Sequence, residues 1–321
     1  MHLFLRKILL FSLIVLALIA AAEVYVRSIP NPARYKHQWM RAHSTEVETL
    51  ILGSSHCFYG INPNMLGTGK AFSLAQPTQP YRYDWYELTH YPMPHLKTVV
   101  LPFSYQSLFE DLESVPRLRY WAVRYRLYMD CDIHSPFSVY GLECLHPASF
   151  REKLTSLWRP AQLKWDSLGF GTSYGTTSLL ATGHDNGIQR VRENTYVWED
   201  TGDKVGSSNF KSQSLIFNTA MLDSIAGWCE RHSVRLLLVT TPVCASFRAN
   251  CSHRQMSITD STLRQILHRH PTVSYHDYWD DTDFHPADFY DADHLNSLGA
   301  AKLTRKIIAD FPSVFSAHNS K

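Results

Sequence analysis

Five short apolar runs, separated by stretches with helical periodicity, constrain the fold of this chain more than any other feature of its sequence. The runs are residues 47–52, 70–75, 97–103, 234–241 and 272–277. Between and after them, apolar residues recur at helical spacing, as in Leu303, Ile307 and Phe311. Residues 81–91, 212–232 and 256–270 also read as helices. Strands that alternate with helices predict an α/β fold, a three-layer α/β/α domain with a mostly parallel sheet.

One long segment interrupts this alternation. About 130 residues separate the third and fourth apolar runs. Residues 115–129 and 147–165 look helical and amphipathic, whereas 169–210 is polar and glycine-rich with no clear period. We predict one domain over residues 46–312, with an inserted helical and loop subdomain at about 104–211 and a tail at 313–321. Insertions of this length are usually lids or substrate-binding surfaces. Four tryptophans could stack on sugar rings there, although packing explains them equally well: Trp121, Trp158, Trp165 and Trp198.

The N-terminus carries an export signal. Arg6 and Lys7 precede an uncharged apolar run, which extends from residue 8 to residue 26 if Glu23 is included. A spanning helix requires about 20 apolar residues, and the small residues at 20–22 also suit a signal peptidase. We favour a signal anchor over residues 1–30, embedded through 8–26, because apolar character resumes before Arg27. A cleaved signal peptide is the alternative. Either places the domain in the periplasm or at the cell exterior, and residues 31–45 are predicted to be a linker.

Charge and cysteine content exclude some classes of partner. The net charge is +2 with Lys and Arg scattered, so no basic field predicts nucleic-acid binding. No CxxC pattern supports a zinc ribbon. Six cysteines suit an oxidising compartment. Two pairs could each close a short loop, Cys131 with Cys144 and Cys244 with Cys251. Cys57 and Cys229 read as buried apolar side chains.

Candidate chemistry lies at the end of the first strand. Residues 50–57 read LILGSSHC, so the strand runs directly into Gly53, Ser54 and Ser55. Ligands of parallel sheets bind beyond the carboxyl ends of the strands. Ser55 could be a nucleophile there, or the segment could simply cap a helix. Asp291 and His294, separated by two residues before the last helix, could supply its orienting carboxylate and base; helix capping and a surface histidine are the alternative.

A Gly-x-Ser block after the first strand, combined with Asp-x-x-His before the final helix, resembles the SGNH/GDSL hydrolases. The resemblance covers about residues 47–103 and 212–311. LGSSH, TTPV and FYDADHLN resemble strings of membrane-anchored members from bacterial surface-polysaccharide loci. The resemblance to this family implies a flavodoxin-like sheet and no cofactor. It also implies Ser55 as nucleophile, His294 as general base, Asp291 as orienting carboxylate, and Gly53 as the residue that permits the turn.

The middle blocks depart from that family. It normally adds a Gly and an Asn to the oxyanion hole, but residues 73–81 (SLAQPTQPY) and 102–108 (PFSYQSL) contain neither. We predict that the Ser55 N–H and the side chains of Gln76 or Gln79 serve instead, with Ser104 a poorer choice. Two functions stay open. One is a serine esterase or O-acyltransferase acting on an acylated exported or cell-surface glycan, or another small ester. The other is an inactive domain that binds polysaccharide or scaffolds an envelope assembly complex.

Other interpretations of these residues are weaker. A cluster of His and Asp residues near the C-terminus could hold zinc or manganese, but it would leave Ser55 unexplained, and we predict no metal. Its members are His285, Asp288, Asp291, Asp293 and His294. A dyad of His56 and Cys57 is disfavoured because adjacent side chains point apart. Asp84 is predicted to be a solvated or capping carboxylate.

Overall fold

The structure is a computed structural model that describes residues 1–66, 70–112, 119–131, 141–145, 163–197 and 208–315. The chain divides into two compact units. The smaller unit comprises residues 1–37 and 112–163, and the larger comprises 38–111 and 164–321. Each unit is described by itself.

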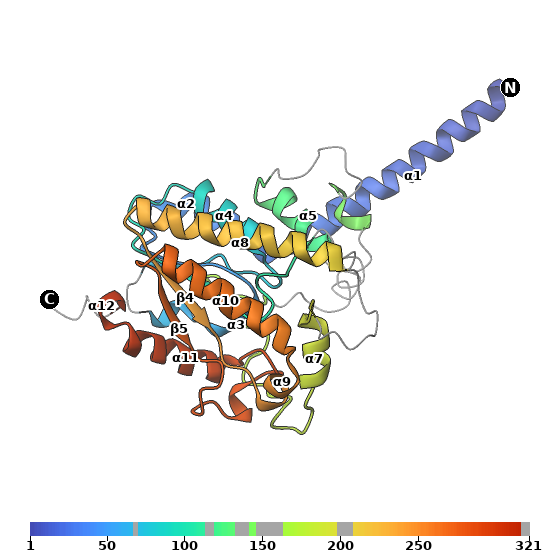
Figure 1. Cartoon of the computed structure of the whole chain (residues 1–321). Coiled ribbons are helices and arrows are strands. Elements are labelled where there is room, and N and C mark those ends of the chain that lie inside the picture. The colour runs from blue at the N-terminus through green and yellow to red at the C-terminus, as the bar shows by residue number, and fades with distance from the viewer. Residues whose placement is uncertain (67–69, 113–118, 132–140, 146–162, 198–207, 316–321) are drawn as a thin grey trace. The chain divides into compact units, whose positions relative to one another are not determined.

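The larger unit is built on a five-stranded parallel sheet in the order β2-β1-β3-β4-β5. β4 and β5 are labelled in Figure 1. Every neighbouring pair is parallel. Each strand lies inside one of the predicted apolar runs: β1 Thr49–Ile51, β2 Ala71–Ser73, β3 Thr98–Pro102, β4 Arg235–Thr240 and β5 Ser274–Asp277. β1, β2 and β3 are buried throughout, as expected for strands covered on both faces. The order is the flavodoxin-like one, and the predicted three-layer α/β/α fold is confirmed.

Two groups of helices cover the sheet. α8 (Ser208–Arg231) contacts both α4 (Tyr81–His90) and α10 (His253–Arg269), and α3 (Ser55–Gly60) contacts α11 (Ser297–Asp310). Except for α3, these helices fall where the sequence predicts helices. Shorter elements complete the unit: η1 Ser44–Glu46, η2 Pro63–Met65, α7 Gly187–Asn194, α9 Ala245–Asn250, η5 Pro286–Asp288 and α12 Pro312–Phe315.

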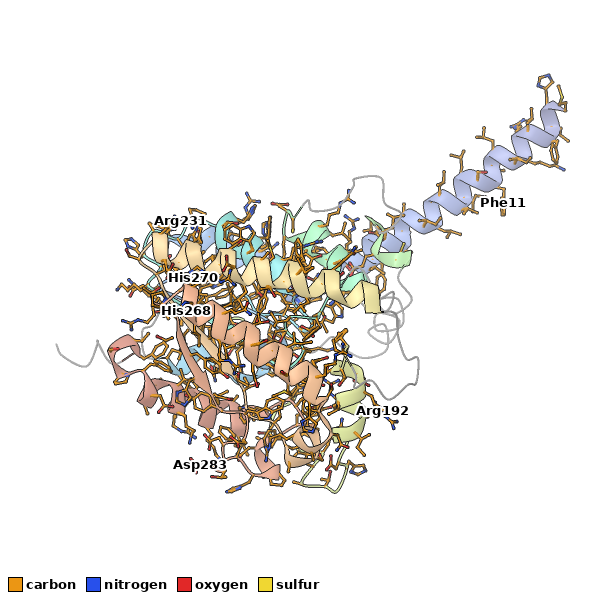
Figure 2. The ribbon with its side chains drawn as sticks, in the orientation of Figure 1. Phe11, Arg192, Arg231, His268, His270 and Asp283 are labelled. Carbon is orange, nitrogen blue, oxygen red and sulfur yellow. The ribbon has the colours of Figure 1, made fainter. Side chains whose placement is uncertain are left out.

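α1 (His2–Ser28) belongs to the smaller unit and carries the predicted export signal. Among the described residues it is the one helix long and apolar enough to cross a membrane, with a mean hydropathy of 2.5 over its most apolar window. Most of its apolar side chains are exposed, including Phe11 (Figure 2), whereas Val26 is buried. A signal anchor and a signal peptide both fit this helix.

The stretch predicted to be a linker, residues 31–45, is mostly helical. α2 covers Pro32–His43. The Asn31 side chain accepts a hydrogen bond from the Arg34 N–H at 2.8 Å, and Pro32 suits the first turn because its missing N–H needs no partner. Ala33 and Met40 are buried. Asn31 and Pro32 are therefore a signal for the start of a helix. The prolines of this stretch had instead suggested an extended chain.

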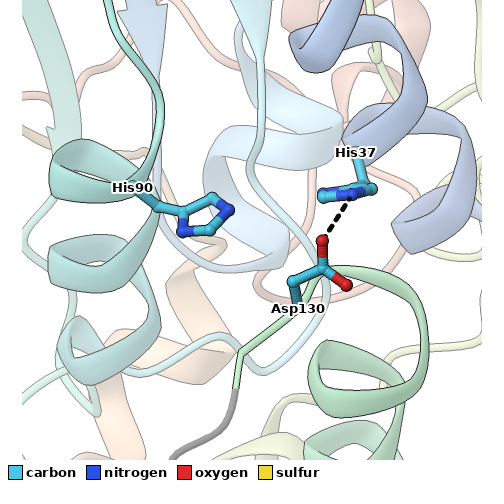
Figure 3. Close-up of side chains that lie close together, drawn as sticks. All are labelled: His37, His90 and Asp130. Carbon is cyan, nitrogen blue, oxygen red and sulfur yellow. Dashed lines mark ion pairs between the residues drawn. The ribbon is translucent and has the colours of Figure 1, made fainter.

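Polar contacts within the smaller unit connect α1 to the segment that follows α5 (Arg119–Tyr128). Glu23 accepts the N–H groups of Glu143, at 3.1 Å, and Cys144, at 2.9 Å. Arg27 donates to Glu23 at 2.6 Å. η4 (Glu143–Leu145) therefore holds the last turns of α1. His37 and Asp130 form an ion pair at 3.3 Å in the same unit (Figure 3).

The segment predicted as one insertion is divided. Residues 112–163 belong to the smaller unit, but 164–197 belong to the larger one. α5 lies in the predicted helical stretch, whereas residues 146–162, with Trp158, and 198–207, with Trp198, lie outside the described residues. Trp165 is buried and pairs with Gly171 through an isolated bridge, which supports packing as its role, and Trp121 is partly buried. α7 forms in the polar stretch where no helix was predicted.

All six cysteines are free thiols, so neither possible pair forms a disulfide. Cys57 and Cys229 are buried, as predicted.

Candidate active site

The turn after β1 depends on Gly53. Its φ is +98°, a conformation that side chains other than hydrogen resist. A Cβ at this position would lie 2.0 Å from the Cδ of Pro102 at the end of β3. Ser54 then occupies the N-cap, and α3 begins at Ser55. Glycine at 53 therefore lets the chain turn tightly against β3 and places Ser55 at the carboxyl end of the sheet.

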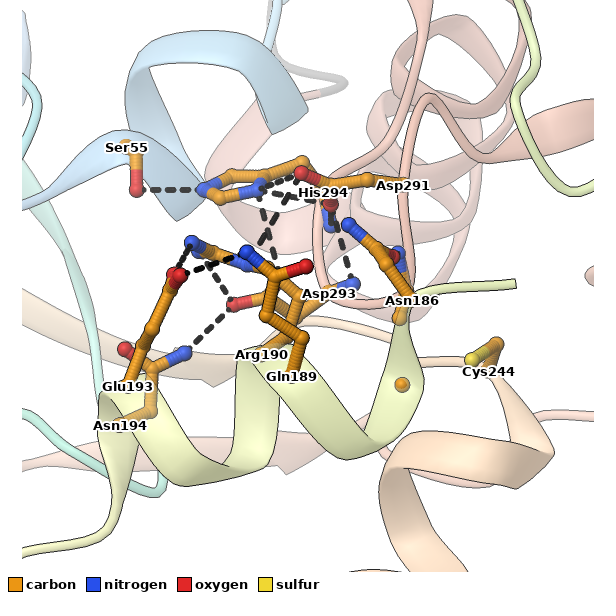
Figure 4. Close-up of polar contacts among 12 residues, drawn as sticks. Ser55, Asn186, Gln189, Arg190, Glu193, Asn194, Cys244, Asp291, Asp293 and His294 are labelled. Atoms are coloured by element: carbon orange, nitrogen blue, oxygen red, sulfur yellow. Dashed lines mark hydrogen bonds and ion pairs between the residues drawn. The ribbon is translucent and has the colours of Figure 1, made fainter. Parts of the chain in front are cut away.

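Three predicted residues meet there (Figure 4). The His294 Nε2 lies 2.8 Å from the Ser55 Oγ. The His294 Nδ1 lies 2.9 and 3.1 Å from the two carboxylate oxygens of Asp291. With the proton on Nδ1 directed at Asp291, Nε2 presents its lone pair to the Ser55 hydroxyl. Residues 239 positions apart in the chain thus form a continuous Ser–His–Asp hydrogen-bond array.

Backbone hydrogen bonds within the loop before α11 hold Asp291 and His294 in place. The Asp291 carboxylate accepts the backbone N–H groups of Asp293, at 3.2 Å, and His294, at 2.9 Å. Asn296, and not Asp291, caps α11 by accepting the N–H groups of Leu298 and Gly299. Asp291 and His294 are both buried. The alternative of helix capping and a surface histidine is therefore wrong for this pair.

A second carboxylate, that of Asp293, also faces His294. Its Oδ1 lies 3.4 Å from the His294 Nδ1. Two residues of α7 hold it: Arg190 donates from Nε at 2.6 Å and from a terminal nitrogen at 3.0 Å, and Asn194 donates at 2.9 Å. From the sequence, Asp293 reads only as a metal ligand. Arg190 and Asn194 give no signal of their role, because they lie in a polar stretch without periodicity.

The charges at the site set the direction of three pKa shifts. Burial alone would lower the pKa of His294, but the charges of Asp293 and Asp291 outweigh burial and raise it. Burial would raise the pKa of Asp293, but His294, His56 and Arg190 bring it well below its ordinary value. Burial dominates at His56 and lowers its pKa. These shifts favour the ionised form of Asp293 and the neutral form of His56.

His56 turns away from Cys57 and toward β3. Its Nδ1 lies 2.6 Å from the Ser104 Oγ, and its Nε2 lies 3.6 Å from Asp293. Cys57 is buried and burial raises the pKa of its thiol, so the two do not form a reactive dyad. Ser104, with its hydroxyl committed to His56, sits behind the array as a structural partner.

The carboxylate of Asp84 is fully buried and does not cap α4, so its prediction as a solvated or capping carboxylate is wrong. It accepts the Gly53 N–H at 2.7 Å. Gln79 donates to Asp84 at 2.5 Å and to Glu87 at 2.9 Å. Burial raises the pKa of Asp84 to about 7, against the opposing effect of these hydrogen bonds. The carboxylate therefore fixes the backbone from which Ser55 projects.

These contacts bear on the predicted oxyanion donors. Both N–H bonds of the Gln79 amide are used by Asp84 and Glu87, which contradicts its prediction as a donor to substrate. Gln76 is buried after β2, where its backbone N–H donates to Gly53, and its role stays a prediction. The helical hydrogen bonds of α3 begin with the N–H groups of Cys57 and Phe58, which donate to Ser54. The Ser55 N–H therefore precedes that ladder.

Of the five residues considered as metal ligands, Asp291, Asp293 and His294 lie together at the site. The Asp288 carboxylate accepts the His285 backbone N–H and pairs with Lys302, which commits that carboxylate to η5 and α11. Among the described residues, ligand atoms of His56, Asp293 and His294 do lie within 4.8 Å of one another. Arg190 already neutralises that carboxylate, and Ser104 and Ser55 occupy a ring nitrogen of each histidine. This donor set suits internal hydrogen bonding better than a cation.

Three stacked tyrosines stand beside His294. The Tyr174 ring lies 3.8 Å, centroid to centroid, from both Tyr59 and Tyr290. Its edge faces the His294 ring at 5.8 Å. Both faces of Tyr174 are thereby covered, so the stack packs the loop around residues 171–175 against the site.

Comparison with known proteins adds little to this geometry. No family model and no curated protein matches the chain. One solved structure, described as "a putative platelet activating factor from Streptococcus pneumonia", covers 94% of this chain and 98% of its own, at 9% identity and a TM-score of 0.43. A likeness at that level decides neither fold nor function. The class of protein follows from the chain itself: a three-layer α/β/α protein with a Ser–His–Asp array at the carboxyl edge of its sheet.

Proposed function

We propose that this chain is a serine esterase or O-acyltransferase that acts on acyl esters of an exported or cell-surface glycan. The observation that carries the proposal is the Ser55 Oγ, 2.8 Å from the His294 Nε2, with Asp291 on the other ring nitrogen. A serine hydroxyl is a weak nucleophile until a base removes its proton. This array supplies the base and the group that orients it.

The chemistry proceeds through an acyl-enzyme. His294 accepts the Ser55 proton as the Oγ attacks the ester carbonyl, and Asp291 stabilises the imidazolium. Collapse of the tetrahedral intermediate breaks the bond to the sugar oxygen, which takes the proton from His294. Water then attacks the acyl-serine in an esterase, or a second hydroxyl does so in a transferase. His294 serves as base and then acid again, and free Ser55 is restored.

Charge on the carbonyl oxygen needs donors preorganised toward it. The Ser55 N–H, at the start of α3 and ahead of its hydrogen-bond ladder, is our candidate. The Gly and Asn that the family adds are missing from both middle blocks. That departure favours the second candidate function, a domain of weak or no activity that binds polysaccharide or scaffolds an envelope complex.

We further propose that α1 is a retained anchor and that the domain faces the periplasm or cell exterior. Residues 8–26 would cross the membrane with Arg6 and Lys7 inside. Glu23 supports retention, because it accepts two backbone N–H groups of η4. Cleavage after Ala22 would place a new ammonium group on that buried residue. The glycan substrate rests on this export and on the resemblance of the motifs.

Turnover of short acyl esters and of an acetylated oligosaccharide by the full chain tests the catalytic proposal. Ser55→Ala and His294→Ala should each lower kcat at least about 10³-fold, and the double variant should add little, because members of a triad act as a unit. Asp291→Asn should be impaired but keep a trace. Ser54→Ala is the matched control: its hydroxyl is buried without a hydrogen-bond partner among the described residues, so turnover should persist. Equal turnover by wild type and Ser55→Ala would refute the mechanism.

A further inference from the structure

We propose that Asp293 is a positioning residue for His294, held in that role by Arg190 and Asn194, so that α7 is a working part of the active site. The inference rests on the proposed function of His294 as general base. The site then contains two functional carboxylates, those of Asp291 and Asp293, whereas the Asp-x-x-His motif accounts only for Asp291.

Geometry separates the two carboxylates. Asp291 accepts the Nδ1 proton at 2.9 Å and also binds two backbone N–H groups of its own loop. Asp293 lies 3.4 Å from the same nitrogen, and the structure gives it no direct hydrogen bond to the His294 ring. Asp291 therefore selects the tautomer, whereas Asp293 acts on His294 through its charge.

Burial requires that this charge be held from elsewhere. The Asp293 side chain is 0% exposed, and an isolated carboxylate so placed would be protonated. Arg190 donates hydrogen bonds to both carboxylate oxygens of Asp293, and Asn194 donates a third (Figure 4). Gly187, in the first turn of α7, packs where a Cβ would lie 2.2 Å from the Ser246 Oγ. α7 is thus seated closely enough to keep Arg190 on Asp293.

A role in stability alone explains this arrangement poorly. Removing an ion pair from water costs about as much as the pair returns, so apolar residues would serve a core at least as well. His56 reinforces the electrostatic interpretation: its ring lies 5.4 Å from that of His294 and also faces Asp293, at 3.6 Å. The Asp293 carboxylate therefore faces two histidines. Burial favours the neutral form of His56, and His294 is the one that accepts a proton.

Other groups also face His294 and bear on any titration. The charged ones are Asp291 and Asp293 on its own loop and Arg190 on α7. Glu110, buried after β3, interacts with His294, Asp293 and Arg190, and burial raises its pKa to about 8, so it is largely neutral below that pH. Tyr59 and Tyr174 face the ring edge-on, and burial raises the pKa of each hydroxyl. Asp293 and Arg190 are therefore the two groups whose substitution tests the proposal.

The test measures deuterium exchange at the C2 carbon of individual histidine rings against pH, by mass spectrometry of the full chain in detergent. Removing the negative charge with Asp293→Asn should move the His294 midpoint to lower pH. Arg190→Gln should also move it to lower pH, because the buried Asp293 carboxylate then lacks the cation that keeps it ionised. Arg190→Lys, which keeps the charge, should stay near wild type. His268, an exposed residue of α10 (Figure 2), is the internal control and should not move in any variant.

Arg190→Lys separates the effect of charge from that of a loosened loop, because it loses the two-point contact with Asp293 but keeps the positive charge. No shift in Asp293→Asn, or a shift to higher pH in Arg190→Gln, would overturn the proposal. The Arg190 pair decides the matter if Asp293→Asn does not fold: a Gln variant that titrates like Lys would also overturn it. Exchange needs no catalysis, so a wild type that cleaves no ester refutes the proposed function separately.

Discussion

At the scale of single residues, Gly53 is the position where the backbone leaves least freedom. Both its φ of +98° and the approach of Pro102 to 2.0 Å from a Cβ demand glycine. Gly53→Ala should lower the free energy of unfolding by more than about 3 kcal/mol, since strain and overlap add. Gly175→Ala is the matched control, because its φ is +50° but nothing lies within 4 Å of a Cβ. It should cost about 1 kcal/mol. Urea unfolding compares them, and equal losses would contradict the close approach.

Asp84 makes the stability of the fold depend on pH. Its pKa is about 7 in the folded chain and near 3.8 when unfolded. Between these values the unfolded chain releases a proton that the folded chain keeps, so wild-type stability falls as pH rises through this window. Asp84→Asn cannot ionise, and its Oδ1 can still accept the Gly53 N–H. Its stability relative to wild type should therefore grow by about 3 kcal/mol from pH 4.5 to 7.5.

Urea unfolding at several pH values measures this difference. Asp283→Asn is the control, because Asp283 is exposed (Figure 2) and its pairing with Lys306 lowers its pKa, which puts its titration below the window. Its difference from wild type should stay constant from pH 4.5 to 7.5. A constant difference for Asp84→Asn as well would show that Asp84 is not a buried acid.

The residues that the sequence could reveal are those with a local signature. Ser55 follows a strand within a Gly-Ser-Ser-His string, and Asp291 and His294 are spaced for one loop, so their meeting could be predicted. Asp84 lies in an aromatic, helical stretch that resembles any partly exposed helix, and its burial depends on the turn above it. Arg190 reaches Asp293 across 103 positions, and no pattern near either residue indicates this pairing.

At the scale of elements, His270 ties the end of α10 to α8. It lies 2.9 Å from Glu230 and 3.1 Å from Asp223. Burial lowers its pKa, but the two carboxylates outweigh burial and raise it above 6.5. The stabilisation is therefore complete below the unfolded value and is lost as pH rises through the folded one.

His270→Gln should cost about 1 kcal/mol at pH 5.5, and the loss should shrink as pH increases toward 8. His268→Gln, two residues away and exposed (Figure 2), is the control and should change little at either pH. Thermal unfolding across this range provides the measurement. A loss that grows with pH would mean that neutral, and not charged, His270 joins the two helices.

Elements with regular periodicity were predictable, and those started by local chemistry were not. Each of the five strands lies within its apolar run because parallel strands are buried on both faces and cannot carry polar residues there. α2 was missed because Asn31 and Pro32 read as linker residues. α7 was missed because its polar residues face Asp293 and solvent and give no apolar stripe.

At the scale of the whole molecule, the fate of α1 would decide where the proposed chemistry takes place. If it is a retained anchor, protein from the membrane fraction should have the intact mass that includes residues 1–22, and protease added to spheroplasts should degrade the domain. A soluble product beginning at Glu23 would select the cleaved signal peptide. Protection from protease in spheroplasts, with lysed cells as the control for digestion, would contradict export altogether.

The central claim is that Ser55 is a nucleophile activated by His294, and a fluorophosphonate probe tests it most directly. Mass spectrometry of the labelled full chain should find the adduct on the Ser55 hydroxyl. Ser54→Ala should label as wild type does, and His294→Ala should slow labelling at least about 100-fold, because the hydroxyl then lacks its base. An adduct on another residue, or labelling of Ser55 that is unchanged in His294→Ala, would contradict the claim.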